Sequence, residues 1–339
     1  MMLSELDFEY PEHLVATERA ATSRVMLVQG GKPQELASVE NLMELFRPGD
    51  CLVLNNTRVL KRRVFSESGL EILFLNHSED RKTWDVLCPA TRWKKGVQQI
   101  LPNGVRLELV ARGRPQKVLS SEPLSEKYFE AAGELPLPPY IQKARGDRRN
   151  RTEDSSQYQT VWARKDGSLA APTASLHFSQ EHLVQLRDNG IRIVELTLHV
   201  GLGTFLPITS ENLDEHVMHG EIAEILPEAW QSIQEAKALG GRVWALGTTV
   251  TRTLESAAHG KLQPSATGGF SGETDLFIRS GFEYRVVDAL MTNFHQPRST
   301  LLALVAAFSD LETVKRNYSW AIEREFRLFS YGDLSVWMR

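Results

Sequence analysis

The chain has 339 residues, 42% of them hydrophobic and 24% charged, a balance that is ordinary for a globular protein and excludes a fibrous or disordered chain. Its two cysteines, Cys51 and Cys88, are too few for a disulfide framework or a four-cysteine zinc site, which fits a reducing compartment. The N-terminus lacks the pattern of a signal peptide, and the apolar run 301–308 is far shorter than the ~20 residues that cross a bilayer, so we expect a cytoplasmic protein without a membrane segment.

The net charge of −4 is distributed unevenly along the chain. Residues 58–151 hold 19 Lys and Arg against 11 Asp and Glu, a balance of +8, whereas the other residues hold 20 against 32, a balance of −12. A basic segment in an acidic chain indicates that this segment contacts a polyanion such as a nucleic acid.

The first part of the chain predicts one helix and then a series of short strands. A helix is expected over residues 39–46, followed by a strand over 50–54. Brief apolar runs then alternate with turn residues, a spacing that is typical of a small barrel or sandwich. The runs that we interpret as strands span residues 70–75, 83–88, 105–110 and 116–119.

The connection after these strands is predicted to be irregular. Residues 135–141 contain three prolines, which predicts an extended, stiff segment without helix. Residues 143–157 are polar and basic, which predicts an exposed, mobile loop.

From about residue 158 helices and strands alternate, which indicates α/β architecture. Helices are expected over 180–189 and 227–239, and strands over 191–200, 242–246 and 274–278.

We therefore predict an α/β main domain that is built from both chain ends, residues 1–57 and 152–339. An antiparallel β-barrel domain, residues 58–151, is inserted between the two parts and carries the basic charge.

The predicted strand 191–200 places polar side chains on one face. Side chains alternate along a strand, so Glu195, Thr197 and His199 share a face, while residues 194, 196, 198 and 200 form an apolar face. The turn that follows contains Gly201 and Gly203, where a backbone can approach a ligand closely. A solvated strand face followed by a glycine turn is the alternative.

A second candidate is the turn after the predicted strand 242–246. Thr248 or Thr249 is expected to cap a helix over 250–258, with Arg252 on its first turn. A helix N-terminus at the end of a strand suits an anion such as a carboxylate or phosphate. Simple capping explains the threonines but does not explain the arginine.

A third candidate is the segment 291–300. Asn293 and His295 alternate with Phe294 and can face one pocket, while Ser299 or Thr300 can cap the apolar helix that follows. Either polar residue can instead be a hydrogen-bonded part of the core.

Metal binding and several nucleotide-binding motifs are not supported. His216 and His219 are three residues apart and would share one face of a helix, but no third ligand accompanies them, so acid–base or hydrogen-bonding roles are favoured. The sequence contains no GxxxxGK[ST] loop, no GxSxG elbow and no complete GxGxxG string.

Taken together, short strings along nearly the whole chain resemble the S-adenosylmethionine:tRNA ribosyltransferase-isomerase family. One departure is Asn56, which stands where the family has aspartate. The strings are RPGD at 47–50, LNNTRV at 54–59, PLPPYI at 136–141, YQTV at 158–161, AAPTASLHF at 170–178, TLHVGLGTF at 197–205, HVMHGE at 216–221, GTT at 247–249, GETD at 272–275, TNFH at 292–295 and FSYGD at 329–333.

This resemblance implies an α/β fold with an inserted antiparallel β-barrel. It also implies a reaction in which S-adenosylmethionine donates its ribosyl group to the aminomethyl group of 7-aminomethyl-7-deazaguanine at the wobble position of tRNA. The products would be epoxyqueuosine-tRNA, adenine and methionine. No metal, no cofactor beyond S-adenosylmethionine as co-substrate and no protein partner is implied. A tRNA methyltransferase and a noncatalytic tRNA-binding protein are the alternatives.

The chemistry requires a base to remove a proton and an acid to help adenine leave, roles that histidine and carboxylate side chains can fill. The resemblance and the motifs together give candidate residues for three tasks, with acid and base unassigned. For catalysis they are His177, His199, His219, Glu221 and His295. For substrate binding they are Arg58, Thr173, Gly201, Gly203, Thr204, Thr248, Thr249, Arg252 and Asn293. For tRNA binding they are Lys61, Arg62, Arg145, Arg148 and Arg149.

Overall fold

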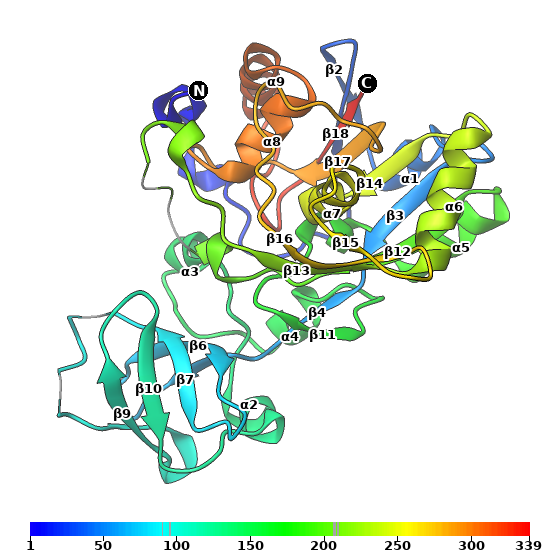
Figure 1. Ribbon diagram of the computed structural model, residues 1–339. Coiled ribbons are helices and arrows are strands. Elements are labelled where there is room, and N and C mark those ends of the chain that lie inside the picture. Colours follow the sequence, from blue (N-terminus) through cyan, green and yellow to red (C-terminus); the bar gives the residue numbers. More distant parts are fainter. Residues whose placement is uncertain (90, 95, 206–207, 209) are drawn as a thin grey trace.

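A mixed ten-stranded sheet and a separate six-stranded sheet organise the chain in the computed structural model (Figure 1). The structure describes residues 1–89, 91–94, 96–205, 208 and 210–339. Within these ranges, none of the helices combines the length and the apolar character that a membrane crossing requires.

The ten-stranded sheet takes its strands from both ends of the chain, in the order β15-β16-β13-β12-β3-β14-β17-β18-β1-β2. The neighbours β12, β3, β14 and β17 run parallel, whereas the strands at either end include antiparallel pairs. The strands are β1 (Val25–Gln29), β2 (Lys32–Leu36), β3 (Cys51–Asn55), β12 (Arg192–Leu198), β13 (Glu221–Ile225), β14 (Val243–Leu246), β15 (Gln263–Pro264), β16 (Phe270–Thr274), β17 (Ala289–Asn293) and β18 (Leu334–Met338).

Helices cover both faces of this sheet, because the central strands are apolar on both sides. In β3, Cys51 and Val53 pack in the core under α6, α7, α8 and α9, while Leu52 and Leu54 pack in the core under α1 and α5. This arrangement confirms the predicted α/β architecture of both chain ends. The helices are α1 (Val39–Met43), α5 (Gln180–Asp188), α6 (Pro227–Ala238), α7 (Thr248–Ala258), α8 (Thr300–Phe308) and α9 (Leu311–Glu323).

The six-stranded sheet is antiparallel throughout and has the order β5-β6-β7-β10-β9-β8. Its core centres on Phe74, Trp84 and Phe129, whose rings meet edge to face; Phe129 belongs to α2 (Glu126–Ala132). The curled sheet confirms the predicted antiparallel strands, while its closure into a barrel stays a prediction. The strands are β5 (Arg63–Phe65), β6 (Glu71–His77), β7 (Thr83–Leu87), β8 (Gln99–Ile100), β9 (Arg106–Ala111) and β10 (Gln116–Ser120).

The segment that leaves this sheet is more ordered than its sequence indicates. The expectation of no helix over 135–141 is wrong at its end, because α3 (Pro139–Arg145) begins at a proline, and a proline at the first helical position loses no hydrogen bond. The expected loop over 143–157 is wrong at both ends, which belong to α3 and α4 (Asp154–Gln157), while residues 146–153 between them contain no helix or strand. Arg145 joins these helices through two hydrogen bonds to Asp154, of 2.7 and 2.8 Å.

One expected strand in the C-terminal half is misplaced. The sequence predicts a strand over 274–278, but β16 ends at Thr274. The Thr274 hydroxyl accepts a hydrogen bond of 3.2 Å from the backbone N–H of Leu276, and this local turn replaces the next rung of the ladder.

A short parallel pair and several single-turn helices complete the chain. The pair joins β4 (Thr57–Val59) to β11 (Lys165–Ser168), beside the ends of the central strands. The single-turn helices are η1 (Leu3–Leu6), η2 (Glu12–Leu14), η3 (Pro102–Gly104), η4 (Thr173–His177), η5 (Leu202–Phe205) and η6 (Leu213–Glu215).

Candidate active site

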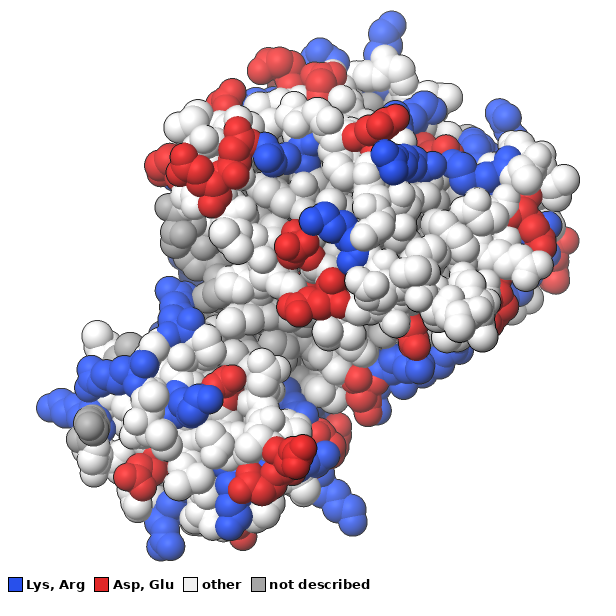
Figure 2. All heavy atoms as spheres, in the orientation of Figure 1, with Lys and Arg blue, Asp and Glu red and all other residues white. Residues whose placement is uncertain are grey.

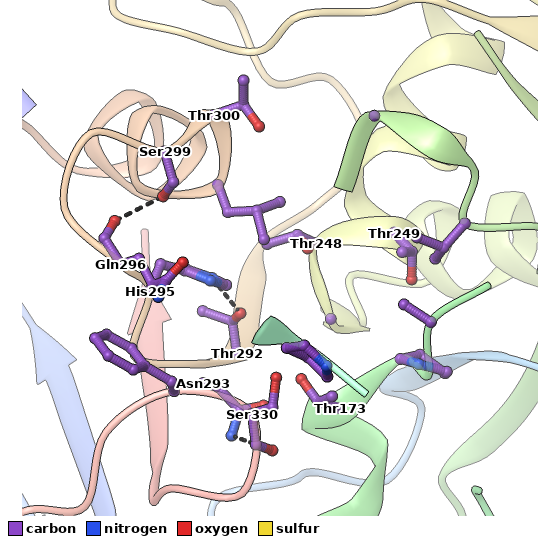
Figure 3. A pocket seen from close by; sticks show the side chains of 18 of the residues that line it. Thr173, Thr248, Thr249, Thr292, Asn293, His295, Gln296, Ser299, Thr300 and Ser330 are labelled. Carbon is purple, nitrogen blue, oxygen red and sulfur yellow. Dashed lines mark hydrogen bonds between the residues drawn. The ribbon is translucent and has the colours of Figure 1, made fainter. Parts of the chain in front are cut away.

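A cavity of about 510 Å³ lies at the carboxyl ends of the parallel strands β14 and β17 (Figure 3). This edge of an open α/β sheet is the usual place for a ligand, because the loops after the strands converge there. The cavity brings together the turn after β14, the segment after β17, η4 and residues 216–221. Nine predicted site residues line it: Thr173, Gly203, His219, Glu221, Thr248, Thr249, Arg252, Asn293 and His295.

The turn after β14 aims the start of α7 at this cavity. Gly247 is the residue before the helix and has a φ of 103°, a conformation that favours glycine. Thr248 and Thr249 are therefore the first two helical residues, and the prediction that one of them caps α7 is wrong. Instead, the Thr249 hydroxyl accepts a hydrogen bond of 3.2 Å from Asn55 Nδ2. The first backbone N–H groups of α7 have no partner within the helix and suit an anion.

Arg252 is buried beside the cavity, with 7% of its surface exposed. It is the fifth residue of α7 and so lies on the second turn, not on the first as predicted. Its Nη1 donates a hydrogen bond to Glu221 and its Nε donates one of 3.3 Å to the Leu276 carbonyl oxygen. Its buried Nη2 has no hydrogen-bond partner within the described part of the chain.

Glu221 is held by the same arrangement and is 5% exposed. One of its oxygens pairs with Arg252, and the other accepts a hydrogen bond of 3.0 Å from the backbone N–H of Gly201. The structure thus joins three residues that the sequence separates, from β13, α7 and the glycine turn. The pair leaves one guanidinium nitrogen, Nη2, available to a ligand.

Asn293, at the end of β17, connects the cavity to His177. Its Nδ2 lies 3.0 Å from His177 Nε2, and His177 Nδ1 lies 2.7 Å from Ser23 Oγ. Burial lowers the pKa of His177 to about 3, so this imidazole is neutral near pH 7. His177 is not part of the cavity lining and reaches the cavity only through Asn293.

Two histidines face the cavity directly. His295 Nε2 lies 2.8 Å from Thr292 Oγ1, and burial lowers the pKa of His295 to about 3. His219 lies against Gly203, where a Cβ atom would stand 3.2 Å from the His219 Cβ. His216 and His219 would share a face only in a helix, and residues 216–220 contain none.

His199 lies in a different place from the other candidate histidines. Its neighbour Val200 lines the main cavity, and adjacent side chains of a strand point to opposite faces. His199 lines a separate hollow of about 250 Å³ on the other face, together with Thr197, Lys165 and Glu224. His199 Nδ1 lies 2.8 Å from Thr57 Oγ1, and burial lowers the pKa of His199.

The remaining predicted residues of the glycine turn contribute mainly backbone. Gly201 donates its N–H to Glu221 and lies outside the cavity lining. Thr204 belongs to η5, and its side chain lies outside the described residues. No cluster of three or more potential metal ligands occurs in the described ranges.

The residues predicted to bind tRNA are not equally accessible. Arg62 is 5% exposed and donates a hydrogen bond of 2.8 Å to Glu126, while the Arg145 side chain is only 2% exposed. The other three are at the surface or partly exposed. Lys61 pairs with Glu130 at 3.0 Å and Arg149 with Glu134 at 2.7 Å, whereas Arg148 is exposed and has no ion pair among the described residues. Arg58, predicted as a substrate contact, is also exposed and pairs with Asp166 at 3.5 Å.

Further cations on the six-stranded sheet and its loops were missed by the sequence reasoning. Figure 2 shows Lys and Arg side chains distributed over the smaller, lower body of the molecule, which contains this sheet. The position of Arg106 on β9, in alternation with the buried Leu107 and Leu109, was the available signal for this residue. Within the described part of 58–151, the exposed cations that form no ion pair are Arg148, which was predicted, and Arg92, Lys94, Arg106, Arg112, Arg114 and Lys127, which were not.

Two further residues of the cavity wall were missed as site candidates. The Tyr140 hydroxyl is hydrogen-bonded to Ser330 Oγ, and it also accepts a hydrogen bond of 3.1 Å from the Ser330 backbone N–H. Burial raises the pKa of Tyr140 to about 12, so the phenol stays protonated. Both residues lie in strings that support the family resemblance, PLPPYI and FSYGD, which was the signal.

A cavity at the carboxyl edge of a parallel sheet, with the neutral imidazole of His295, a buried ion pair and unpartnered polar atoms, is the site of an α/β enzyme that acts on a polar organic substrate. A model of the family described as queuosine biosynthesis protein matches residues 3–336, and the chain belongs to this family.

Named relatives match the chain over almost its whole length. An S-adenosylmethionine:tRNA ribosyltransferase-isomerase from Chlorobaculum parvum is 42% identical over 98% of both chains. A protein of the same name from Halothermothrix orenii is also 42% identical over 98% of both chains. A crystal structure of an S-adenosylmethionine tRNA ribosyltransferase from Thermotoga maritima is 28% identical, with a TM-score of 0.56, and covers 98% of this chain and 100% of that one.

Proposed function

We propose that the protein is an S-adenosylmethionine:tRNA ribosyltransferase-isomerase. It transfers the ribosyl group of S-adenosylmethionine to the aminomethyl group of 7-aminomethyl-7-deazaguanine at the wobble position of tRNA and isomerises it. The products are epoxyqueuosine-tRNA, adenine and methionine. The names of the full-length relatives support the reaction class, and the chemistry of the cavity supports the co-substrate.

The observation that carries the proposal is the pair of unpartnered polar atoms in the cavity wall. Arg252 Nη2 is a buried donor, and Asn293 Oδ1 is a buried acceptor. A buried polar atom without a partner is costly, so these atoms indicate a ligand that supplies both an acceptor and a donor. S-adenosylmethionine carries a carboxylate, amino groups and hydroxyl groups, and it meets this requirement.

The carboxylate of S-adenosylmethionine binds at the start of α7 in this proposal. The free N–H groups of the first turn and the Nη2 of Arg252 together favour an anion. Glu221 holds the guanidinium in place through its ion pair. Thr248, Thr249 and Thr173 line the same cavity and are proposed substrate contacts.

The proton transfers of the reaction are assigned to the cavity side chains. His219, His295 and Glu221 line the cavity and are the proposed proton-transfer groups. Burial lowers the pKa of His295 to about 3, so its imidazole is neutral near pH 7 and burial weakens it as a base. His177 acts through Asn293 as a positioning residue. His199 lies on the opposite face, so its proposed role moves to the hollow beside β4.

The tRNA contacts are proposed to lie on the basic segment 58–151. This segment is proposed to be a barrel domain that is inserted between the two parts of the main domain, residues 1–57 and 152–339. Its +8 balance supports this placement. We keep Lys61, Arg148 and Arg149 as contacts and omit Arg62 and Arg145, whose side chains are buried. The proposal also includes 7-aminomethyl-7-deazaguanine as the base that accepts the ribosyl group, and the cytoplasm as the location of the protein.

Product analysis tests the proposed function directly. The protein is incubated with S-adenosylmethionine and with tRNA that carries 7-aminomethyl-7-deazaguanine, and the small molecules are separated by chromatography. We expect adenine and methionine in equal amounts and a modified tRNA. S-adenosylhomocysteine would instead identify a methyltransferase, and unchanged S-adenosylmethionine would identify a noncatalytic tRNA-binding protein.

A further inference from the structure

Asn293 presents an acceptor that nothing in the described part of the chain satisfies. The residue is 2% exposed, and its Oδ1 lacks a hydrogen-bond partner. Asn293 lies at the carboxyl end of β17 in the wall of the main cavity (Figure 3). A buried amide oxygen without a partner is costly, and an N–H group of a ligand that reaches it restores the missing hydrogen bond.

The surroundings of the Asn293 amide fix which end faces the cavity. Its Nδ2 lies 3.0 Å from His177 Nε2, 3.5 Å from the Ser330 carbonyl oxygen and 3.4 Å from the Gly332 carbonyl oxygen. The reversed amide would place Oδ1 against the two carbonyl oxygens, and these would repel Oδ1 because all three atoms are acceptors.

The tautomer of His177 completes this arrangement. An amide Nδ2 only donates, so His177 Nε2 must accept, and the ring proton must lie on Nδ1. Nδ1 then donates to Ser23 Oγ, 2.7 Å away. The low pKa of His177, caused by burial, keeps the ring neutral and thus able to accept from Asn293 near pH 7. The chain Ser23, His177 and Asn293 therefore holds Oδ1 toward the ligand.

We propose that Asn293 Oδ1 accepts a hydrogen bond from an N–H group of S-adenosylmethionine and thereby selects this co-substrate, an inference that rests on the proposed function. Two groups of the molecule supply such a donor, the 6-amino group of adenine and the α-amino group of the methionine part. If an analogue carries a hydrogen-bond acceptor where S-adenosylmethionine carries this N–H group, two acceptors face each other and no hydrogen bond forms. The cavity then rejects the analogue because a buried acceptor stays unpaired.

Binding of two analogues distinguishes the two groups. S-inosylmethionine has an oxygen in place of the 6-amino group, and the desamino analogue lacks the α-amino group. Dissociation constants for both and for S-adenosylmethionine are measured by titration calorimetry on the full chain. We expect the wild-type protein to bind one analogue about 10- to 100-fold more weakly than S-adenosylmethionine. In Asn293→Ala the dissociation constant of this analogue should be within about threefold of that of S-adenosylmethionine. The analogue whose binding changes in this way identifies the group that donates to Oδ1.

Asn317 offers a matched control. It is also a buried asparagine with an unpartnered Oδ1, but it lies on α9 and outside the cavity lining. Asn317→Ala should leave both affinity ratios unchanged. If Asn293→Ala does not fold, Asn293→Ser removes Oδ1 with a smaller loss of polarity and is judged by the same ratios.

The inference is overturned if both ratios stay the same in the Asn293 variant, or if Asn317→Ala narrows them equally. Failure of the proposed function looks different, because the wild-type protein would then release no adenine and methionine from S-adenosylmethionine, whatever the affinity ratios are. If the wild-type protein turns over normally but the affinity ratios do not change in Asn293→Ala, the proposed role of Asn293 is wrong and the proposed function stands.

Discussion

Replacing Arg145 by alanine should destabilise the protein strongly, although the sequence marks this residue as a tRNA contact. Its guanidinium makes two hydrogen bonds to Asp154, of 2.7 and 2.8 Å, and two to the Thr17 carbonyl oxygen, of 2.9 and 2.6 Å. Asp154 is 1% exposed and would keep a hydrogen bond from the Arg151 N–H. Breaking a buried pair leaves an uncompensated charge, which costs about 3–5 kcal/mol.

The measurement is urea unfolding followed by circular dichroism, with the wild-type protein and Arg145→Ala compared under identical conditions. Lys143→Ala is the control, because Lys143 lies on the same helix and pairs with Glu12 at 2.9 Å, but both side chains are about 80% exposed, at 79% and 82%. The control should unfold at the wild-type midpoint, since exposed pairs contribute little. A loss below about 1 kcal/mol in Arg145→Ala, or weaker tRNA binding at unchanged stability, would refute this reasoning.

Three other predictions concern the tRNA surface, the cavity and the pH dependence of stability. Arg148→Ala should leave the melting temperature unchanged and lower the slope of log affinity for tRNA against log salt by about 1, as measured by filter binding; an unchanged slope would remove it from the surface. Arg252→Lys keeps the positive charge but loses the two parallel N–H donors of the guanidinium, so the KM for S-adenosylmethionine should rise about tenfold while tRNA affinity stays normal. Weaker tRNA binding with an unchanged KM would instead assign the site to a tRNA phosphate. His177 and His295 have folded pKa values near 3, below the ordinary 6.5, so the stability that their neutral forms contribute is complete above about pH 6.5 and is lost as the pH falls toward 3. Between pH 7 and pH 5 the free energy of unfolding, measured with urea, should fall by about 2 kcal/mol per histidine, and the fall should be smaller in His295→Gln. A free energy of unfolding that does not change with pH would contradict the lowered pKa values.

Features set by neighbouring residues were predictable from the sequence. Ser299 caps α8 as expected, by accepting a hydrogen bond of 3.2 Å from the Leu302 N–H. The alternation along β12 is confirmed for Val194 and Leu196, which are buried in the core, and for Glu195, which is partly exposed, whereas Thr197 on the face of Glu195 is also buried. These features depend on periods of a few residues, which a single sequence displays directly.

Features that depend on distant partners were not predictable. Arg145 is like any basic loop residue in the sequence, and its burial follows from Asp154 and from Thr17, a residue 128 positions away. The position of His199 relative to the main cavity follows from which face of β12 the helices α6 and α7 cover. The sequence places His199 opposite the apolar face but does not show on which side the cavity opens.

The position of β18 in the large sheet has a consequence for synthesis on the ribosome. β18, residues Leu334–Met338, lies between β17 and β1, with Val25 opposite Leu334 and Asn293 opposite the same residue on the other side. β1 and β2 are made before the other strands, yet among the described residues the strand that pairs them with the rest of the sheet is β18, which is made after all the others. The six-stranded sheet, in contrast, pairs residues that emerge within a short interval of one another. The nascent chain can therefore complete the smaller sheet first, while the β1–β2 hairpin joins the large sheet only after β18 has been made.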